Sequence, residues 1–252
     1  MARIATYVFM DLETTGLPLE ENNKTRITEI SFVAVKRRHL LDTRAGCSPR
    51  VQQKITLCLN PRRMIQPSCT DVTAQNGFGF DYPILKHHLE KLKVSFTNDL
   101  MCADCYHAFY DILESRKRMK MQKGTLNKDE IDEIGSSLQQ ENSLHMQQVN
   151  ESTPKRQIIK TASHRVQNSM SKAVRRFPWS QGEKPKEKYK LKDVYERLLN
   201  RPCIDAHRAE NDCVMALQCS VVLSQDFVHW VDGNHKPFAE VKPMTIGVKV
   251  GS

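Results

Sequence analysis

The sequence feature that most constrains the fold is a nearly continuous apolar segment at residues 4–10. Its β-branched and aromatic side chains predict a strand that is buried on both faces of a central sheet. Residues 27–35 and 54–59 have the same character and predict two further strands. The N-terminal part of the chain is therefore expected to begin as a three-stranded sheet.

Helical periodicity replaces this pattern further along the chain. Residues 83–92 carry apolar side chains at helical spacing, with Pro83 in the first turn, where its missing donor costs nothing. The remaining elements are expected to be a strand at 99–103, a turn or two of helix at 106–113, a helix at 189–199 and a long helix at 206–224. Candidate core positions of the last helix are Ala209, Cys213, Ala216, Leu217, Val221 and Leu223. Two periodicities in one chain indicate an α/β fold, with a mixed sheet flanked by helices.

The composition changes between residues 114 and 188, where Ser, Gln, Asn, Lys and Glu dominate and aromatic residues are few. Such a segment buries too little apolar area to offset its chain entropy, so a disordered insert is predicted. The insert would divide one domain into a first part, 1–113, and a second part, 189–245, followed by a tail, 246–252.

The positive charge of the chain is concentrated in the same region. The formal net charge is +9, and residues 115–192 hold 18 Lys and Arg against 8 Asp and Glu. Basic side chains near phosphates release counterions, so the insert favours binding to nucleic acid or another polyanion. A basic linker that is merely solvated is the alternative.

The cysteines and the apolar runs indicate the cellular compartment in which the protein is expected. No secretory leader precedes the eight cysteines, which predicts reduced thiols. Cys102 and Cys105 form a C-x-x-C pair, but no second pair follows at zinc-like spacing, so a metal or redox role is not favoured. No run of about 18 apolar residues is present, so we expect an intracellular protein that does not span a membrane.

Two acidic residues follow the first predicted strand directly. Alternation along an extended chain places Asp11 and Glu13 on the same face. Their mutual repulsion requires neutralisation, and Mg²⁺ or Mn²⁺ prefers such hard oxygen ligands. For this pair alone, a turn with two solvated acids is the simpler alternative. Gly16, just beyond, is able to take a positive φ, which would let a substrate approach the backbone closely.

Two downstream segments contain further candidates. Asp81 precedes the helix predicted at 83–92 and suits an N-cap position. His207 and Asp212 open the last predicted helix, about one and a half turns apart. A histidine at a helix start is by itself more typical of a cap or a surface residue. Taken separately, neither segment specifies a chemistry.

Together, three strings carry a family resemblance. Residues 11–18 (DLETTGLP) resemble the first motif of the DEDD exonucleases, and the pattern H-x-A-E-x-D at 207–212 resembles the third motif of the DEDDh branch. Residues 76–85 (NGFGFDYPIL) look most similar to the three-prime repair exonucleases, which degrade DNA from its 3′ ends. The resemblance covers about 4–110 and 189–245, and it implies a ribonuclease H-like fold.

The resemblance also implies a mechanism and its residues. The chain would be a metal-dependent 3′→5′ exodeoxyribonuclease that releases nucleotides by two-metal hydrolysis, with two Mg²⁺ ions that Mn²⁺ can replace. The implied metal ligands are Asp11, Glu13, Asp81 and Asp212. His207 would be the general base. Substrate contacts would come from Thr14, Leu17 and Phe80. The implied setting is DNA repair by a homodimer acting on single-stranded or frayed 3′ ends, in the nucleus, the cytoplasm or both.

One connection departs from the family pattern. Only residues 61–75 separate the third predicted strand from Asn76, and they show neither a helical stripe nor a strand. A parallel crossover takes a dozen or more residues before a strand is added. The connection is therefore expected to be a shortened crossover, and the resemblance implies that about forty residues present in the relatives are absent. Impaired activity and stability are expected from this gap.

Two alternatives to an active DNA exonuclease stay open. The first is a catalytically inactive variant that binds nucleic acid or a partner protein. The second is a DEDDh exoribonuclease, although aromatic platforms for single-stranded RNA are sparse in the sequence.

Overall fold

A computed structural model describes residues 4–65, 76–129, 178–179, 184–203, 208–248 and 250. The chain divides into one unit of Met1–Lys117 and Val174–Ser252 and a second unit of Arg118–Ala173. The described part of the second unit, 118–129, is helical. The strands and the candidate site residues belong to the first unit.

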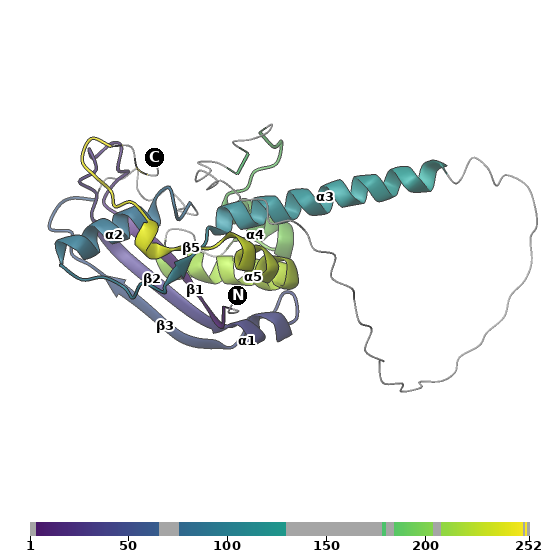
Figure 1. Cartoon of the computed structure of the whole chain (residues 1–252), viewed down its shortest axis with the longest axis horizontal. Helices are drawn as coiled ribbons and strands as arrows, with labels where there is room; N and C mark the ends of the chain where they lie inside the picture. The colour runs from purple at the N-terminus through teal and green to yellow at the C-terminus, as the bar shows by residue number, and fades with distance from the viewer. Residues whose placement is uncertain are drawn as a thin grey trace, which may run out of the picture. The chain divides into compact units, whose positions relative to one another are not determined.

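A three-stranded antiparallel sheet forms the centre of this unit (Figure 1). It consists of β1 (Thr6–Thr14), β2 (Ile27–Lys36) and β3 (Val51–Cys58), in the order β1-β2-β3. A second, small sheet pairs β4 (Met101–Cys102) with β5 (Lys236–Pro237). Every strand pair in the described residues is antiparallel, whereas a mixed sheet was expected.

The first strand differs from its prediction in extent and in burial. β1 continues to Thr14, so Asp11 and Glu13 lie inside the strand and not after it. Tyr7 and Phe9 are buried, but Val8 between them is 53% exposed. The expectation of a strand buried on both faces is therefore wrong at this end of β1, because in the described residues the elements that cover this face reach Leu12 but leave Val8 exposed.

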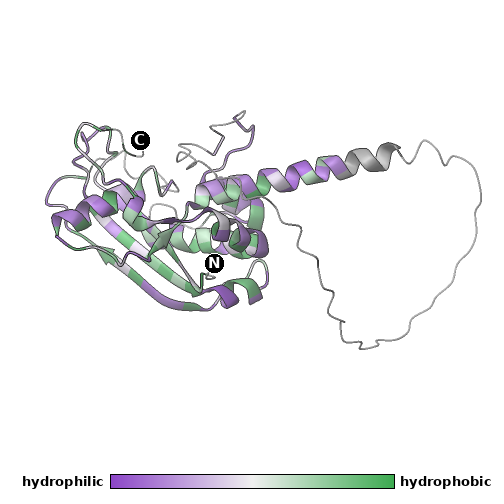
Figure 2. Ribbon diagram, viewed as in Figure 1, coloured by the Kyte–Doolittle hydropathy of each residue, from purple (hydrophilic) through white to green (hydrophobic). Residues whose placement is uncertain are grey.

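The helices cover the two faces of the sheet unequally. The helices are α1 (Arg37–Asp42), α2 (Asp81–Lys91), α3 (Cys105–Asp129), α4 (Leu191–Leu199) and α5 (Ala209–Asn234). One face, with Tyr7 and Val33, packs in a core with residues of α3, α4 and α5. The opposite face, with Leu12 and Ile30, packs on α2 and on the C-terminal segment. Figure 2 shows hydrophobic residues along the strands and α5.

Two helices are longer than predicted. All six predicted core positions of α5 are buried, and the helix continues ten residues past the expected end, to Asn234. The helix expected at 106–113 is wrong in its end, since α3 runs to Asp129. Glu114 and Lys117 of α3 both contact Tyr189, so the first turns of the predicted insert pack on the domain. Most of the remaining insert lies outside the described residues.

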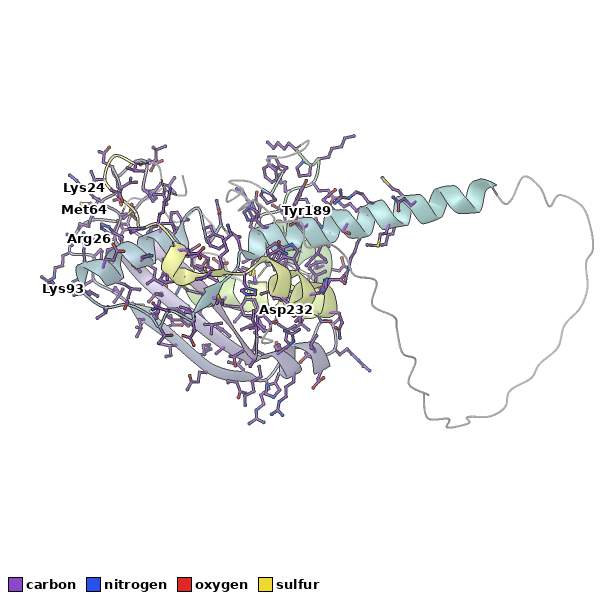
Figure 3. The ribbon with its side chains drawn as sticks, viewed as in Figure 1. Lys24, Arg26, Met64, Lys93, Tyr189 and Asp232 are labelled. Atoms are coloured by element: carbon purple, nitrogen blue, oxygen red, sulfur yellow. The ribbon has the colours of Figure 1, made fainter. Side chains whose placement is uncertain are left out.

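The chain that leaves β3 returns toward the loop before β2. Arg26 donates to the carbonyl of Pro61 (2.8 Å), and Arg63 donates to the carbonyl of Lys24 (3.0 Å). Figure 3 shows Lys24, Arg26 and Met64 at the end of the molecule where α2 lies. Met64 is 90% exposed. Residues 66–75, where the crossover was expected to be too short, lie outside the described residues.

Within the described residues, every helix is too short or too polar to cross a membrane.

Candidate metal centre

One face of β1 leads from the hydrophobic core to an acidic site. Side chains alternate along a strand, so Tyr7, Phe9, Asp11 and Glu13 share one face. Phe9 stacks on Phe227 in the C-terminal half of α5, with ring centroids 6.2 Å apart. Asp11 and Glu13, further along, meet Asp212 in the first turn of the same helix. The packing of β1 against α5 thus brings together acids that are far apart in the sequence.

The three carboxylates are close enough to share a cation. One oxygen atom from each of Asp11, Glu13 and Asp212 lies within 4.8 Å of the others. Asp11 is 4% exposed and Asp212 is 2% exposed. One oxygen of Asp11 and both oxygens of Asp212 are buried without a hydrogen-bond partner. Buried acceptors without donors are costly, and a hard divalent cation such as Mg²⁺ satisfies them, so these residues fit a metal site.

Burial and repulsion raise the pKa of each of these acids. Burial is the main cause for Asp11, and the nearby carboxylates Asp81, Asp212 and Glu13 raise its pKa further. The pKa of Glu13 is raised to about 7 by burial, then by Asp212 and Glu29, and is lowered in part by Arg208. Burial raises the pKa of Asp212 to about 7. Without a cation the cluster therefore holds protons near neutral pH.

Asp81 lies beside this cluster but not within it. It is the first residue of α2, and Phe80 is the N-cap, so the predicted N-cap role of Asp81 is wrong. The backbone of Leu12 hydrogen-bonds to its carboxylate, which places Asp81 at the edge of β1 that faces away from β2. One of its oxygens is buried without a partner, and burial and Asp104 raise its pKa to about 8. Asp81 is thus the least tightly gathered of the four acids.

The other predicted site residues are placed unevenly. Thr14 is buried and donates to the carbonyl of Gly16 (3.2 Å). Leu17 is half-buried in the turn after β1, and Phe80 packs against the core beside α2. His207 lies outside the described residues, and the helix that it was expected to open begins at Ala209.

Gly16 is required for a reason other than the expected one. It does not adopt the positive φ that is open to a glycine. A Cβ at this position would lie 2.5 Å from the carboxyl carbon of Glu21. Thr15 donates a hydrogen bond to the same carboxylate (2.8 Å). The glycine therefore makes room for a buried acid that closes the turn after β1.

Three charged residues near the site were not identified as site residues from the sequence. Glu29 is 7% exposed and lies directly opposite Glu13 on β2. Arg208 donates to Glu29. Asp104 accepts hydrogen bonds from the backbone of Phe78 (3.3 Å) and Tyr106 (2.9 Å), so it ties α3 to the turn before Asp81. Only Asp104, an acid between a predicted strand and a predicted helix, had a recognisable signal.

Comparison with known proteins finds relatives that are named as three-prime repair exonucleases. No family model matches the chain. This chain is 26% identical over 256 residues to three-prime repair exonuclease 1 of Bos taurus, and the alignment covers 96% of this chain and 71% of the bovine protein. It is 30% identical over 144 residues to three prime repair exonuclease 2 of Mus musculus, and that alignment covers 40% of this chain and 60% of the mouse protein. The chain is a homologue of the three-prime repair exonucleases.

The alignment with the mouse exonuclease also has a length difference. Forty per cent of 252 residues is about 101 residues, so about 43 of the 144 aligned positions have no residue of this chain opposite them. In the bovine alignment 96% of the chain is about 242 residues, which leaves about 14 such positions among 256. The mouse value is close in size to the roughly forty residues expected to be absent before Asn76, and the position of this gap in the chain stays a prediction.

The raised pKa values predict how this homologue responds to pH and metal. The folded state binds these protons more tightly than the unfolded state, so the stability of the metal-free protein falls as pH rises from about 4 to about 8. Mg²⁺ replaces the protons and should raise the melting temperature by several degrees at pH 8 but little at pH 5.5. Thermal unfolding in EDTA and in Mg²⁺ at both pH values measures this, and an equal Mg²⁺ effect at both would contradict it.

Proposed function

We propose that this protein is a metal-dependent 3′→5′ exonuclease that acts on DNA, built on a ribonuclease H-like fold. The observation that carries the proposal is the group of three buried carboxylates from β1 and α5, whose oxygens lie within 4.8 Å of one another. The relatives named as exonucleases support the reaction class. The basic segment 115–192 supports a polyanionic substrate.

The proposed roles follow from the chemistry of each side chain. Asp11, Glu13 and Asp212 would hold divalent cations, with Asp81 completing the set from α2. Bound Mg²⁺ would supply a more acidic water and stabilise the charge on the departing 3′-oxygen. His207 is proposed to accept the proton of the attacking water, since its ordinary pKa lies near 6.5.

Three further residues are proposed to position the terminal nucleotide. Thr14 and Leu17 belong to the turn that follows the two acids of β1, and Phe80 directly precedes Asp81. A substrate whose scissile phosphate reaches the cluster would therefore place its terminal sugar and base near both segments. Leu17 and Phe80 are partly exposed and offer apolar surface to a base.

An inactive nucleic-acid-binding variant is the second candidate. The observation in its favour is that Asp81 lies outside the tight group of three, at an edge of β1 that pairs with no strand in the described residues. A metal site that lacks its fourth ligand in the required place loses rate steeply, since a shift of about 1 Å can cost about 10²-fold.

Hydrolysis of labelled oligonucleotides tests the proposal. We expect the full chain to release mononucleotides from a 3′-labelled single-stranded DNA in Mg²⁺ or Mn²⁺, and not in EDTA. The same sequence as RNA should be cut more slowly, and a 5′ label should appear in mononucleotides only at the end of the reaction. Faster cutting of RNA would favour the exoribonuclease alternative. No release at high protein concentration, with DNA binding retained, would favour the inactive variant.

A further inference from the structure

Arg208 lies at the entrance to the acidic cluster. It is the N-cap residue of α5, and its carbonyl accepts a hydrogen bond from the backbone of Asp212 (3.1 Å). Its side chain is 60% exposed, whereas Asp212 is 2% exposed. The same short segment therefore presents a buried acid to the site and an exposed cation beside it.

The guanidinium group is held from one side only. Nε donates to Oε2 of Glu29 at 3.1 Å, and Glu29 lies opposite Glu13 in the β1-β2 register. Because Glu29 lies opposite Glu13, the bound guanidinium is close to the acidic cluster. The two terminal nitrogens carry four N–H donors, and they make no hydrogen bond with the rest of the described chain. These donors are available to an acceptor outside the protein.

A nucleic acid approaching this site meets four carboxylates. Asp11, Glu13, Glu29 and Asp212 are all buried or half-buried on one face of β1, β2 and α5. Divalent cations offset part of the repulsion between these groups and a phosphate. A planar guanidinium with one edge bound to Glu29 offers its other edge to phosphate oxygens, a geometry that an ammonium does not provide.

We propose that Arg208 binds a phosphate oxygen of the substrate strand at the edge of the metal cluster, while Glu29 holds its guanidinium in place. This inference rests on the proposed nuclease function, for which it names a substrate-binding residue. The competing role is that of a counter-ion, in which Arg208 only neutralises the Glu13 and Glu29 pair. Exposed ion pairs add little to stability, so the melting temperature does not separate the two roles. The affinity for DNA does, because only a phosphate-binding residue contributes to it directly.

Binding measurements in Ca²⁺ separate the two roles. Arg208→Ala should weaken the binding of a short fluorescent single-stranded DNA by about tenfold and reduce the slope of log affinity against log salt by about 0.7. In the absence of DNA the same substitution should tighten Ca²⁺ binding several-fold in calorimetry, because a cation next to Glu13 is removed. Opposite signs for DNA and metal are not expected from general loss of structure.

Two further variants control for charge and shape. Arg208→Lys keeps the charge, so Ca²⁺ affinity should stay near that of the wild type while DNA binding recovers only in part. Arg116→Ala removes an equal charge from an exposed ion pair with Asp226 on α3 and α5. It should leave the affinity for Ca²⁺ unchanged and weaken DNA binding less than Arg208→Ala does.

The proposal is overturned if Arg208→Ala leaves DNA affinity and its salt slope unchanged, or if Arg116→Ala has the same effect on both. Failure of the proposed function has a different signature. A wild-type protein that binds DNA and Ca²⁺ but never releases nucleotides would contradict the exonuclease proposal, and the Arg208 comparison would still be measurable.

Discussion

Replacement of Asp212 by Asn should lower the rate of nucleotide release by more than about 100-fold while the metal-free protein becomes more stable at pH 8. Loss of groups that only support a metal ligand costs about 10- to 100-fold, so loss of a ligand itself should cost more. Asp212 is buried beside Asp11 and Glu13, and it raises the pKa of both. An uncharged amide relieves that repulsion, which is why stability should rise as activity falls.

The measurements are the Mg²⁺-dependent rate on 3′-labelled DNA and the melting temperature in EDTA. Asp226→Asn is a matched control, because it removes an exposed carboxylate from the same helix. It should change neither quantity appreciably. A fall in melting temperature that parallels the loss of rate in Asp212→Asn would instead assign Asp212 a structural role.

His207→Ala should also reduce the rate of nucleotide release, by about 10²- to 10⁴-fold, while leaving the affinity for Ca²⁺ intact.

The part of the site that depends on local geometry was predictable from the sequence. Two-residue alternation alone places Asp11 and Glu13 on one face, and no knowledge of the fold is needed for that. Their meeting with Asp212 depends on the packing of β1 against α5, about two hundred residues apart in the chain. Periodicity contains no information on such a contact, so this part rested on the resemblance between motifs.

The charged neighbours of the site were not predictable, because they depend on register. Glu29 lies opposite Glu13 only because the turn and the bulge at Glu13 and Thr14 fix the β1-β2 pairing. A shift of one residue would move Glu29 to the other face. Arg208 reaches Glu29 because α5 begins at the next residue, and helix starts are read from sequence with an error of a residue or two.

The end of α3 shows where composition misled the prediction. Residues after 113 lack a hydrophobic stripe, which is typical of an insert without a core. The Arg, Lys, Met and Gln residues at 116–123 are nevertheless good helix formers, and a helix already anchored by Phe109 and Ile112 needs no new nucleus to continue. Helix propensity therefore decided the conformation of this segment, where the absence of a core had been taken as evidence for disorder.

Adding the crossover that is predicted to be missing should raise both the exonuclease rate and the stability. The face of the sheet that carries α2 is covered only in part, since Val8, Ile55 and Leu57 on that face are each at least 50% exposed. In the described residues β1 pairs with β2 alone, although it holds two of the proposed metal ligands. A strand beside β1 would pair its free edge, and preceding helices would cover apolar surface that is now exposed.

Such an insertion should act on Asp81 more than on the other acids. Asp11, Glu13 and Asp212 are fixed by β1 and α5, which the gap does not interrupt. Asp81 begins α2, which follows the short connection directly, and it contacts β1 through the backbone of Leu12. A new strand next to β1 would fix the start of α2 and bring Asp81 into the cluster. An improvement of about 1 Å in its position corresponds to about 10²-fold in rate.

The experiment replaces residues 66–75 by a segment of the mouse exonuclease that is about forty residues longer, which is the length of the predicted gap. A Gly- and Ser-rich insertion of equal length is the matched control, because it lengthens the connection but forms neither strand nor helix. We expect the first insertion to raise the Mg²⁺-dependent rate by about 10²-fold and the melting temperature by several degrees. The control should raise neither the rate nor the melting temperature, since a longer flexible loop adds closure entropy and no burial.

Equal rates and melting temperatures for the grafted and the original chain would show that residues 61–75 already build a sufficient substitute. The connection would then be a compact solution to the same topology, and Asp81 would need no further element to reach the metal.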